Sequence, residues 1–484
     1  MFHIPLLRGG RPYRSLDVKP LRDFRTGETI AEISQANPGL IAKDLAGMRR
    51  LDLGIGELLE ICRRAARLFA EADLPQSPDD YVRRLSVTCG LPETLCRFNM
   101  EKIRTVLDNM ESVLAGLTRG LDLSVLDSGL GTQDGCRLSY LPQTDVFGAI
   151  LPSNSPGVHT LWLPAPVLKV PVALKPGREE PWTPFRICQA FLAAGLPPAA
   201  LGFYPSDHAG AAEILMRCGR SALFGDEATV RPWKGDARVQ IHGPGWSKVL
   251  FGEDQGWEPH LDLLVTSIAS NGGRSCLNAS GVWIPGGGRE LAEALAARLA
   301  TIEALPLDHP EAGLAAFPRP QVAHHISDLI DRHLRVPGAV DLTAEIRGSR
   351  VAEVGGCTFL LPTLIWCEDP DHPLANTELL FPFASVVQVP RDEMLARIGP
   401  TLVATALTGD PRFQRELLDC PWIDRLNLGA IPTSRVSWDQ PHEGNLFAHL
   451  YRQRAIQVAP HPLAPSPIAL PSPGRGGTQV GELS

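Results

Sequence analysis

The chain has 484 residues, of which 44% are hydrophobic and 21% are charged, and its formal net charge is -8 at pH 7. This composition is typical of a globular protein and excludes a mainly disordered chain. No run of about 18 apolar residues is present, so we expect no membrane span. The acidic balance argues against a nucleic-acid partner, because phosphate backbones require a concentrated cationic face.

The cysteines and histidines indicate a reducing compartment and no metal site. Ten cysteines stand at irregular spacing without a Cys-x-x-Cys pair, which disfavours a disulfide framework and a zinc centre. His324, His325 and His333 lie close together, but their spacing matches no metal-binding pattern. The first residues lack the basic start and long apolar stretch of a secretory signal, so the cytoplasm is the expected location.

Periodicity divides the chain into a helical leader and two α/β lobes. Residues from about 20 to 130 show apolar positions mainly at helical spacing, as between Leu58 and Phe69. From Val146 onward, short apolar runs ended by Pro or Gly alternate with helical stretches such as Phe185 to Ala194 and Ala209 to Cys218. This alternation predicts a parallel sheet covered by helices on both faces.

A second alternating region follows the first. We expect residues 1–238 to hold the leader and the first lobe, and residues 239–436 to form the second lobe around the apolar runs SGVWIP, TFLLPTLIW and FASVVQV. Residues 437–457 are expected to return to the first lobe. Residues 458–484 are rich in Pro, Gly and Ser and are predicted to be disordered, because they cannot bury enough surface to offset the cost of ordering.

One cysteine, Cys276, stands just after a predicted helix end. Apolar positions from Trp257 to Asn271 step by three or four residues, which predicts an amphipathic helix that Gly272 and Gly273 terminate. A thiol on such a turn lies near backbone N–H groups, which favour the reactive thiolate over a thiol whose ordinary pKa is about 8.5. The alternative is a buried cysteine that only fills space.

Five segments resemble motifs of the aldehyde dehydrogenase superfamily, in the order in which that family carries them, over residues 20 to 457. Gly273-Arg274-Ser275-Cys276 is similar to the Gly-Gln-x-Cys that holds the family's nucleophile. The other four segments are similar to the family's Ala-Thr-Gly-Glu-Val-Ile, Pro-Trp-Asn-Phe-Pro, Val-Leu-Lys-Pro and Glu-Glu-Ile-Phe-Gly-Pro; they are Arg25 to Ile30, Leu151 to Pro156, Val172 to Pro176 and Thr377 to Pro382. Their shared order makes the nucleophile interpretation of Cys276 the stronger one.

The resemblance implies both a fold and a set of roles. The fold is α/β, with two doubly wound lobes, a helical leader and a small oligomerisation hairpin; NAD or NADP binds within residues 1–238 and thiol chemistry belongs to 239–436. Cys276 is implied to be the nucleophile. The side-chain amide of Asn154 and the backbone N–H of Cys276 are implied to meet the developing oxyanion. The alternative for Asn154 is a turn former that bonds its own backbone.

The resemblance also implies the cofactor contacts. Lys175 ends a strand, where it would reach the hydroxyls of the adenosine ribose. Glu378 would hold the hydroxyls of the nicotinamide ribose. A solvated lysine and an exposed carboxylate are the alternatives. The remaining implied contacts are Pro152, Ser153 and Gly225.

The family's general base, a glutamate in Glu-Leu-Gly-Gly-Lys, is missing. Counting back from Phe251 places Ile241 at that position. Without a base to activate water, a thioester on Cys276 would survive until another nucleophile arrives, as in the branch that exchanges the acyl group with coenzyme A. His242 would serve as base only if the strand register slipped, because adjacent strand residues point to opposite faces.

Two further departures concern the cofactor. Asp226 and Glu227 replace the neutral residues that the family places after its Phe-Thr-Gly, and their charges would repel a pyrophosphate. This segment is similar to that of fatty acyl-CoA reductases in the superfamily. Arg178 stands where many relatives have a glutamate, and it would attract the 2′-phosphate of NADP. Glu179 and Glu180 are expected to oppose that attraction.

The sequence therefore predicts an NAD(P)-dependent oxidoreductase that interconverts an aldehyde and an acyl thioester through Cys276, with coenzyme A as acyl partner. One alternative is a hydrolytic aldehyde dehydrogenase with His242 or another group as base. The other is a non-catalytic binding or scaffold protein. The resemblance also implies a homodimer or homotetramer, with residues 136–144 in the pairing hairpin. Substrate chain length does not follow from the sequence.

Overall fold

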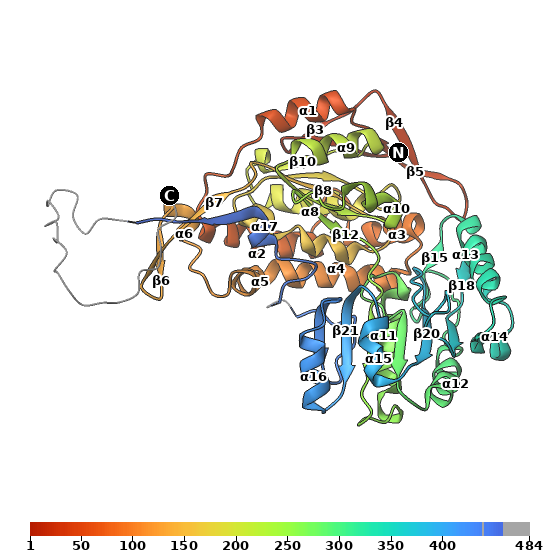
Figure 1. Ribbon diagram of the computed structural model, residues 1–484. Helices are drawn as coiled ribbons and strands as arrows, with labels where there is room; N and C mark the ends of the chain where they lie inside the picture. The colour runs from red at the N-terminus through yellow and green to blue at the C-terminus, as the bar shows by residue number, and fades with distance from the viewer. Residues whose placement is uncertain (438–439, 458–484) are drawn as a thin grey trace, which may run out of the picture.

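The computed structural model describes residues 1–437 and 440–457, and within them the chain forms two seven-stranded sheets in two lobes (Figure 1). The first sheet has the order β12-β11-β8-β9-β10-β2-β3, in which β8 to β12 are parallel and β2 and β3 form an antiparallel edge. Its strands are β2 (Leu6–Arg8), β3 (Arg11–Tyr13), β8 (Phe147–Ile150), β9 (Val172–Lys175), β10 (Leu201–Phe203), β11 (Arg220–Phe224) and β12 (Val239–His242).

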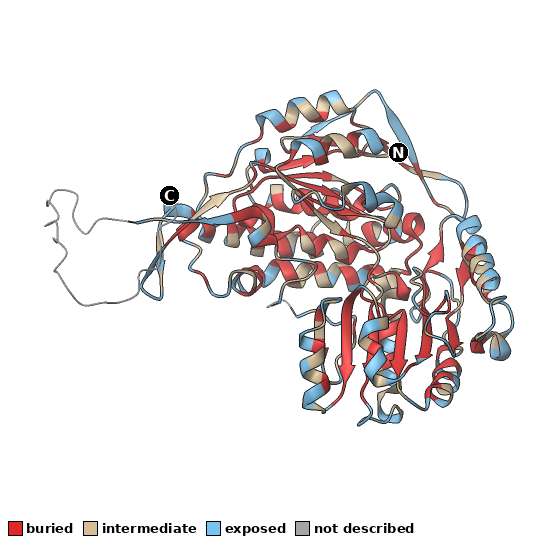
Figure 2. Cartoon of the chain, viewed as in Figure 1, coloured by how far each residue is buried: buried red, intermediate tan, exposed pale blue. Residues whose placement is uncertain are grey.

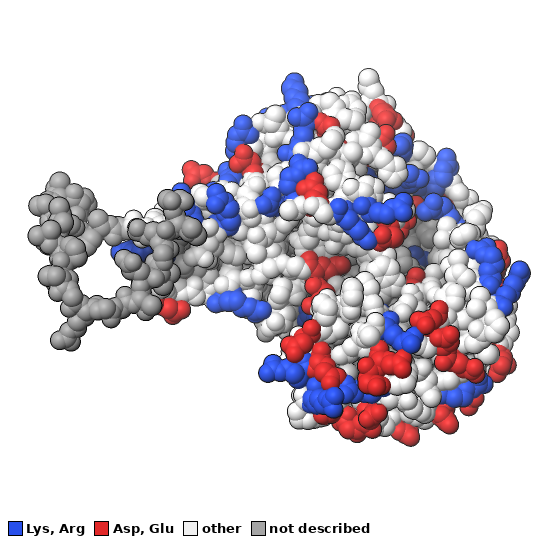
Figure 3. Space-filling view, viewed as in Figure 1, with Lys and Arg blue, Asp and Glu red and all other residues white. Residues whose placement is uncertain are grey.

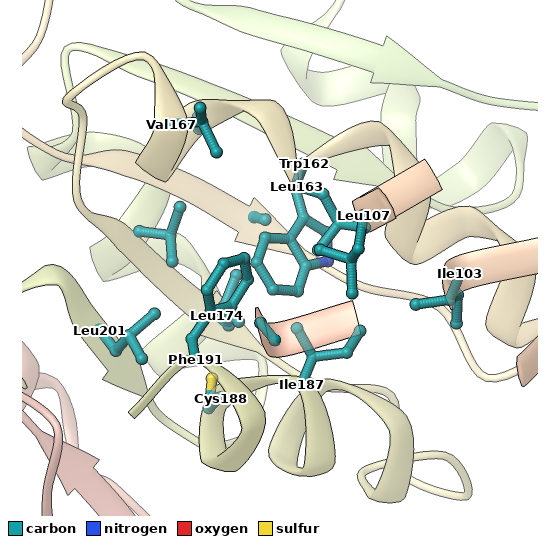
Figure 4. Packing of buried hydrophobic residues seen from close by; sticks show 14 of the residues in the cluster. Ile103, Leu107, Trp162, Leu163, Val167, Leu174, Ile187, Cys188, Phe191 and Leu201 are labelled. Carbon is teal, nitrogen blue, oxygen red and sulfur yellow. The ribbon is translucent and has the colours of Figure 1, made fainter. Parts of the chain in front are cut away.

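The predicted strand-helix alternation of the first lobe is confirmed. The apolar runs form β8 to β11, and the intervening helical stretches form α8 (Trp182–Ala193) and α9 (His208–Arg217). Every residue of β8 and β10 is buried, as expected for parallel strands covered on both faces. Figure 4 shows side chains such as Leu107, Leu174 and Phe191 gathered around Trp162 beneath this sheet.

The leader is helical only from residue 38. Its helices are α1 (Pro38–Gly47), α2 (Ile55–Glu71), α3 (Pro78–Cys89), α4 (Glu93–Asp108), α5 (Met110–Thr118) and α6 (Val125–Ser128). The prediction of helix from about residue 20 is wrong for the first segment, where β1 (Phe2–Ile4), β4 (Val18–Arg22) and β5 (Thr29–Ser34) make a small sheet. Gly27, with φ of 75°, closes the turn between β4 and β5, and this turn carries the segment from Arg25 to Ile30.

The second sheet has the order β16-β19-β20-β14-β13-β21-β22, parallel except for β16. Its strands are β13 (Lys248–Phe251), β14 (Gly281–Ile284), β16 (Ala339–Asp341), β19 (Thr363–Cys367), β20 (Phe383–Gln388), β21 (Thr401–Leu407) and β22 (Ile423–Leu428). Most of these strands are buried throughout (Figure 2). The helices of this lobe are α11 (Leu261–Ala269), α12 (Gly288–Leu299), α13 (Pro320–His333), α14 (Leu342–Arg347), α15 (Arg391–Arg397) and α16 (Pro411–Leu418). A small sheet of β15 (Ala316–Phe317), β17 (Val351–Val354) and β18 (Cys357–Leu360) joins it.

The division between the lobes lies later than predicted. Strand β12 pairs with β11 in the first sheet, so the chain changes sheets between His242 and Lys248, not at residue 238. The short apolar runs of β12 and β13 look alike in the sequence, and neither run indicates which strand it will pair with. The consequence is that His242 belongs to the first lobe.

The return segment closes on a hairpin of the first lobe. β6 (Gly131–Gln133) and β7 (Cys136–Pro142) form a hairpin, in which the predicted residues 136–144 supply only the second strand, and β23 (Tyr451–Arg454) pairs with β7 after α17 (Leu446–Leu450). The disorder predicted for residues 458–484 lies outside the described residues. No helix in the described part of the chain is long and apolar enough to cross a membrane. Acidic and basic side chains are interspersed on the face shown in Figure 3.

We predict that Gly273→Ala destabilises the second lobe. Gly273 has φ of 69°, and a Cβ added to it would lie 2.2 Å from the carbonyl carbon of Phe381. A left-handed backbone and a backbone clash together cost about 2 kcal/mol or more. Thermal unfolding should show a lowered Tm, whereas Gly286→Ala, whose Cβ meets nothing within 4 Å, should leave the Tm unchanged. Equal Tm values for the two variants would contradict the described turn.

Candidate active site

A cavity of about 980 Å³ is lined by residues of both lobes. Seven of the nine residues that the sequence predicted for the site line it: Pro152, Ser153, Asn154, Gly225, His242, Cys276 and Glu378. Lys175 and Arg178 are not among the lining residues. Residues far apart in the chain, from the first lobe and from the second, therefore meet at one place.

Cys276 follows a tight turn. The interlobe linker, residues 243–247, contacts it through a hydrogen bond from Ser247. Asn271, Gly272 and Gly273 all have left-handed φ values, as the paired glycines predicted for the last two. The Ser247 hydroxyl donates to the carbonyl of Cys276 at 2.8 Å. Cys276 is half-buried: it lines the cavity and also packs against a small hydrophobic cluster that contains Leu402 and Val403.

Asn154 reaches across the lobe boundary. Its Nδ2 donates to the carbonyl of Arg274, two residues before the nucleophile, at 3.0 Å. An amide group carries two N–H bonds, so one remains for a ligand in the cavity. Beside it, Asn271 donates to Ser155 Oγ at 3.0 Å and accepts from the amide of Asn99 at 2.8 Å. Asn154 is thus bonded to the nucleophile's own segment.

Several charged groups act on the Cys276 thiol. Burial raises its pKa well above the ordinary value, and the carboxylates of Glu443 and Glu378 raise it further, whereas Lys102 opposes them. Lys102 lies on α4 and lines the cavity, and burial lowers the pKa of its own ammonium group. The cation that lowers the pKa of the thiol, Lys102, therefore comes from the helical leader, where no sequence motif was found.

His242, and not Ile241, lines the cavity that contains Cys276. The His242 ring lines the cavity and stacks on Phe224, with ring centroids 4.2 Å apart. Ile241 instead packs in the hydrophobic cluster on the other side of β12. His242 Nδ1 shares a hydrogen bond with the carboxylate of Glu443. A base candidate with a carboxylate partner is thus present in the cavity.

Glu378 and Lys248 both bond the backbone of Trp246. The N–H of Trp246 donates to the Glu378 carboxylate, and Lys248 Nζ donates to the Trp246 carbonyl at 2.7 Å. Burial raises the pKa of Glu378 to about 7. Burial also lowers the pKa of Lys248 to about 7. The carboxylate predicted to bind a ribose is therefore bonded to the chain that links the two lobes.

Only some of the residues that the sequence implied for cofactor binding line the cavity. Lys175 ends β9 and is half-buried, and Arg178 is exposed. Glu180 does not oppose Arg178 as predicted, because its carboxylate is buried and bonded to His159 Nε2 at 2.7 Å. Asp226 accepts the N–H of Thr229 at 2.8 Å and caps α10 (Glu227–Val230), so a carboxylate already occupies that helix start.

Comparison with known proteins places this architecture. The model of the aldehyde dehydrogenase family matches residues 18–399. The chain belongs to the aldehyde dehydrogenase family. It is 24% identical to a betaine aldehyde dehydrogenase of Cereibacter sphaeroides, over 87% of this chain and 89% of the relative. It is 26% identical to a phenylacetaldehyde dehydrogenase of Pseudomonas fluorescens, over 72% of this chain and 74% of the relative.

A solved structure shares the fold of this family member. The NAD+ complex of an aldehyde dehydrogenase from Bacillus cereus superposes with a TM-score of 0.75, at 15% identity, over 95% of this chain and 97% of the other. The cavity also has lining residues that the sequence did not predict, among them Lys102, His442 and Glu443. These three come from α4 and the return segment, and no local pattern links either segment to Cys276.

We predict that the Cys276 thiol of the ligand-free protein is mainly protonated at neutral pH. Because its pKa is raised, alkylation by iodoacetamide should accelerate as the pH rises through and above 9. Lys102→Met should slow alkylation at a fixed pH, because the thiolate loses a nearby cation. Glu378→Gln should accelerate it, because the thiolate loses a nearby carboxylate. Mass spectrometry of the alkylated peptide gives the rate, and acceleration in Lys102→Met or slowing in Glu378→Gln would contradict this electrostatic description.

Proposed function

We propose that this chain oxidises an aldehyde with NAD or NADP through a covalent bond to Cys276. The observation that supports this best is the convergence of Cys276, Asn154 and His242 in one cavity between the lobes. Nucleophile, oxyanion donor and base are the three parts that acyl transfer through a thiol requires. The thiolate attacks the aldehyde carbon, and Asn154 with the Cys276 N–H receives the charge that develops on oxygen.

Two side chains support binding of a nicotinamide dinucleotide by its riboses. Glu378 offers a carboxylate in the cavity, and Lys175, outside the cavity lining, ends a strand of the parallel sheet. When bound, the nicotinamide supplies the acceptor for the hydride that the thiohemiacetal loses. Near Gly225 the fit is weaker, because Asp226 caps α10 where an anionic group would otherwise approach.

Water is the acyl acceptor that we propose first. His242 faces the cavity, and its bond to Glu443 leaves Nε2 as the ring nitrogen that can take a proton from water. The oxygen of that water then attacks the thioester carbon, the C–S bond breaks, and a carboxylic acid leaves. Both curated relatives above are also described as dehydrogenases of aldehydes.

Coenzyme A as acyl partner is the second candidate. No glutamate stands at either Ile241 or His242, where the family's base would be sought, and Asp226 and Glu227 give this chain the segment that is similar to fatty acyl-CoA reductases. If His242 is inactive as a base, the thioester on Cys276 would persist until a thiol arrives.

We also propose a location and an oligomeric state. The cytoplasm is the proposed location, because all ten cysteines are free thiols. The proposed oligomer is a homodimer or homotetramer that pairs through the hairpin of β6 and β7.

We expect a panel of aldehydes to yield reduced nicotinamide and carboxylic acid in the absence of coenzyme A. Cys276→Ala should abolish this activity, and Asn154→Ala should lower kcat by about 10²–10³. Nicotinamide absorbance reports the oxidation, and chromatography identifies the product. Acid that forms only after coenzyme A is added, or an acyl thioester as the sole product, would favour the second candidate. A protein that binds no nicotinamide in a thermal-shift titration would instead be a non-catalytic relative.

We predict that Arg178→Glu shifts cofactor preference away from NADP. The exposed guanidinium attracts the 2′-phosphate, and Glu180 does not offset it because that side chain is buried. The ratio of kcat/KM for NADP to that for NAD should fall by about tenfold or more, a difference of about 1.4 kcal/mol. Arg412→Glu on the exposed face of α16 makes the same charge change far from the site and should leave the ratio unaltered. An unchanged ratio in Arg178→Glu would remove Arg178 from the cofactor site.

A further inference from the structure

Glu443 has a backbone conformation that its residue type disfavours. Its φ is 49°, in the left-handed region, and Gly444 follows with φ of 93°. Both backbone groups of Glu443 are held: its carbonyl accepts the side-chain amide of Gln240, and its N–H bonds Asp424. A strained residue that its surroundings fix in this way points to a role for the side chain it presents.

The Glu443 carboxylate lies between two histidines. Its Oε2 bonds His242 Nδ1, and the same oxygen is 3.8 Å from Nε2 of His442. The two return-segment side chains are only 9% and 10% exposed, and both line the cavity with Cys276. Within the described residues, His442 Nδ1 has no hydrogen-bond partner. His442 Nδ1 is thus a buried polar atom without a partner, on a ring that lies next to the Glu443 carboxylate.

The Glu443 carboxyl is ionised beside His242. Burial opposes ionisation of Glu443, yet the charge of His242 and the bond to it lower the pKa of this carboxyl below its usual range. Burial lowers the pKa of His442 to about 4, so this ring is neutral near pH 7. The other titratable or charged groups facing this cluster are Cys276, Lys102, Glu378, Asp424 and Arg425.

We propose that Glu443 is a positioning residue, whose bond to Nδ1 orients the His242 ring so that Nε2 faces the thioester on Cys276. This inference rests on the proposed hydrolytic function. Water adds to the thioester carbon and gives its proton to His242 Nε2, and the Glu443 carboxylate stabilises the imidazolium that forms. The C–S bond breaks, and the Cys276 sulfur leaves as thiolate. The carboxylate of the return segment thereby supports the histidine that replaces the missing glutamate.

Rapid mixing of enzyme, nicotinamide and aldehyde separates the two halves of the reaction. In Glu443→Gln, the burst of reduced nicotinamide should keep its amplitude and should not slow, because Cys276 and Asn154 are intact and the thiol loses a neighbouring negative charge. Steady-state turnover should fall by about a hundredfold. The acid-side inflection of its pH profile should move to lower pH, because the imidazolium loses its counter-charge. Glu290→Gln, which removes an exposed carboxylate on α12, should change neither phase.

Further variants keep the test clear of folding defects. Glu443→Gly relieves the left-handed strain, so its Tm should not fall although its turnover falls as in Glu443→Gln. Glu443→Asp keeps the charge and should recover part of the turnover. Unchanged steady-state turnover and an unchanged pH profile in Glu443→Gln would overturn the proposal.

An activity-independent measurement separates this inference from the proposed function. In the full chain labelled with ¹⁵N-histidine, the ring signals of His242 in the wild type should show that Nδ1 carries the proton shared with Glu443. These signals should change in Glu443→Gln. Identical His242 ring signals in the two proteins would overturn the contact even if the enzyme oxidises aldehydes. Conversely, changed signals in a protein that oxidises no aldehyde would refute the proposed function and leave the contact between Glu443 and His242 standing.

Discussion

The close approach of the interlobe linker to the nucleophile fixes the geometry of the whole site. A Cβ on Gly245 would lie 2.1 Å from the carbonyl oxygen of Cys276, so only glycine fits there. The Ser247 hydroxyl bonds the same carbonyl, and the N–H of Leu402 from β21 bonds the carbonyl of Gly245. These contacts anchor the crossing chain to the second sheet directly behind the thiol. The groups that the first lobe contributes can therefore face Cys276 with little freedom.

The turn itself shows how strain and polarity offset each other at this site. Three successive residues adopt left-handed backbone, and Asn271 is the costly one because it carries a Cβ. Its side chain accepts from Asn99 on α4 and donates to Ser155 in the first lobe. One asparagine thereby ties the nucleophile turn to the leader and to the segment that carries Asn154. The polar bonds hold a backbone that packing alone would not select.

Local signals in the sequence were sufficient where a residue's role depends on its neighbours in the chain. The paired glycines predicted the turn before Cys276, and the strands β8 to β11 followed from short apolar runs with Pro or Gly at their ends. Whether the His242 side chain points into the cavity or away from it depends on a shift of one residue in strand register. Counting back from Phe251 does not determine that register. The boundary after β12 depends on strand pairing, which the sequence does not encode locally. Lys102 and Glu443 reach the cavity only through tertiary packing, so no spacing rule could have found them.

The pairing of β23 with β7 has a consequence for synthesis of the protein. The strand that completes the small sheet of the first lobe, and the glutamate that contacts His242, are both encoded after the entire second lobe. During translation, one edge of β7 in the amino-terminal lobe therefore stays unpaired until nearly the whole polypeptide has left the ribosome. A truncated chain that ends before this segment would lack a wall of its pocket, so premature products should be inactive and prone to self-association.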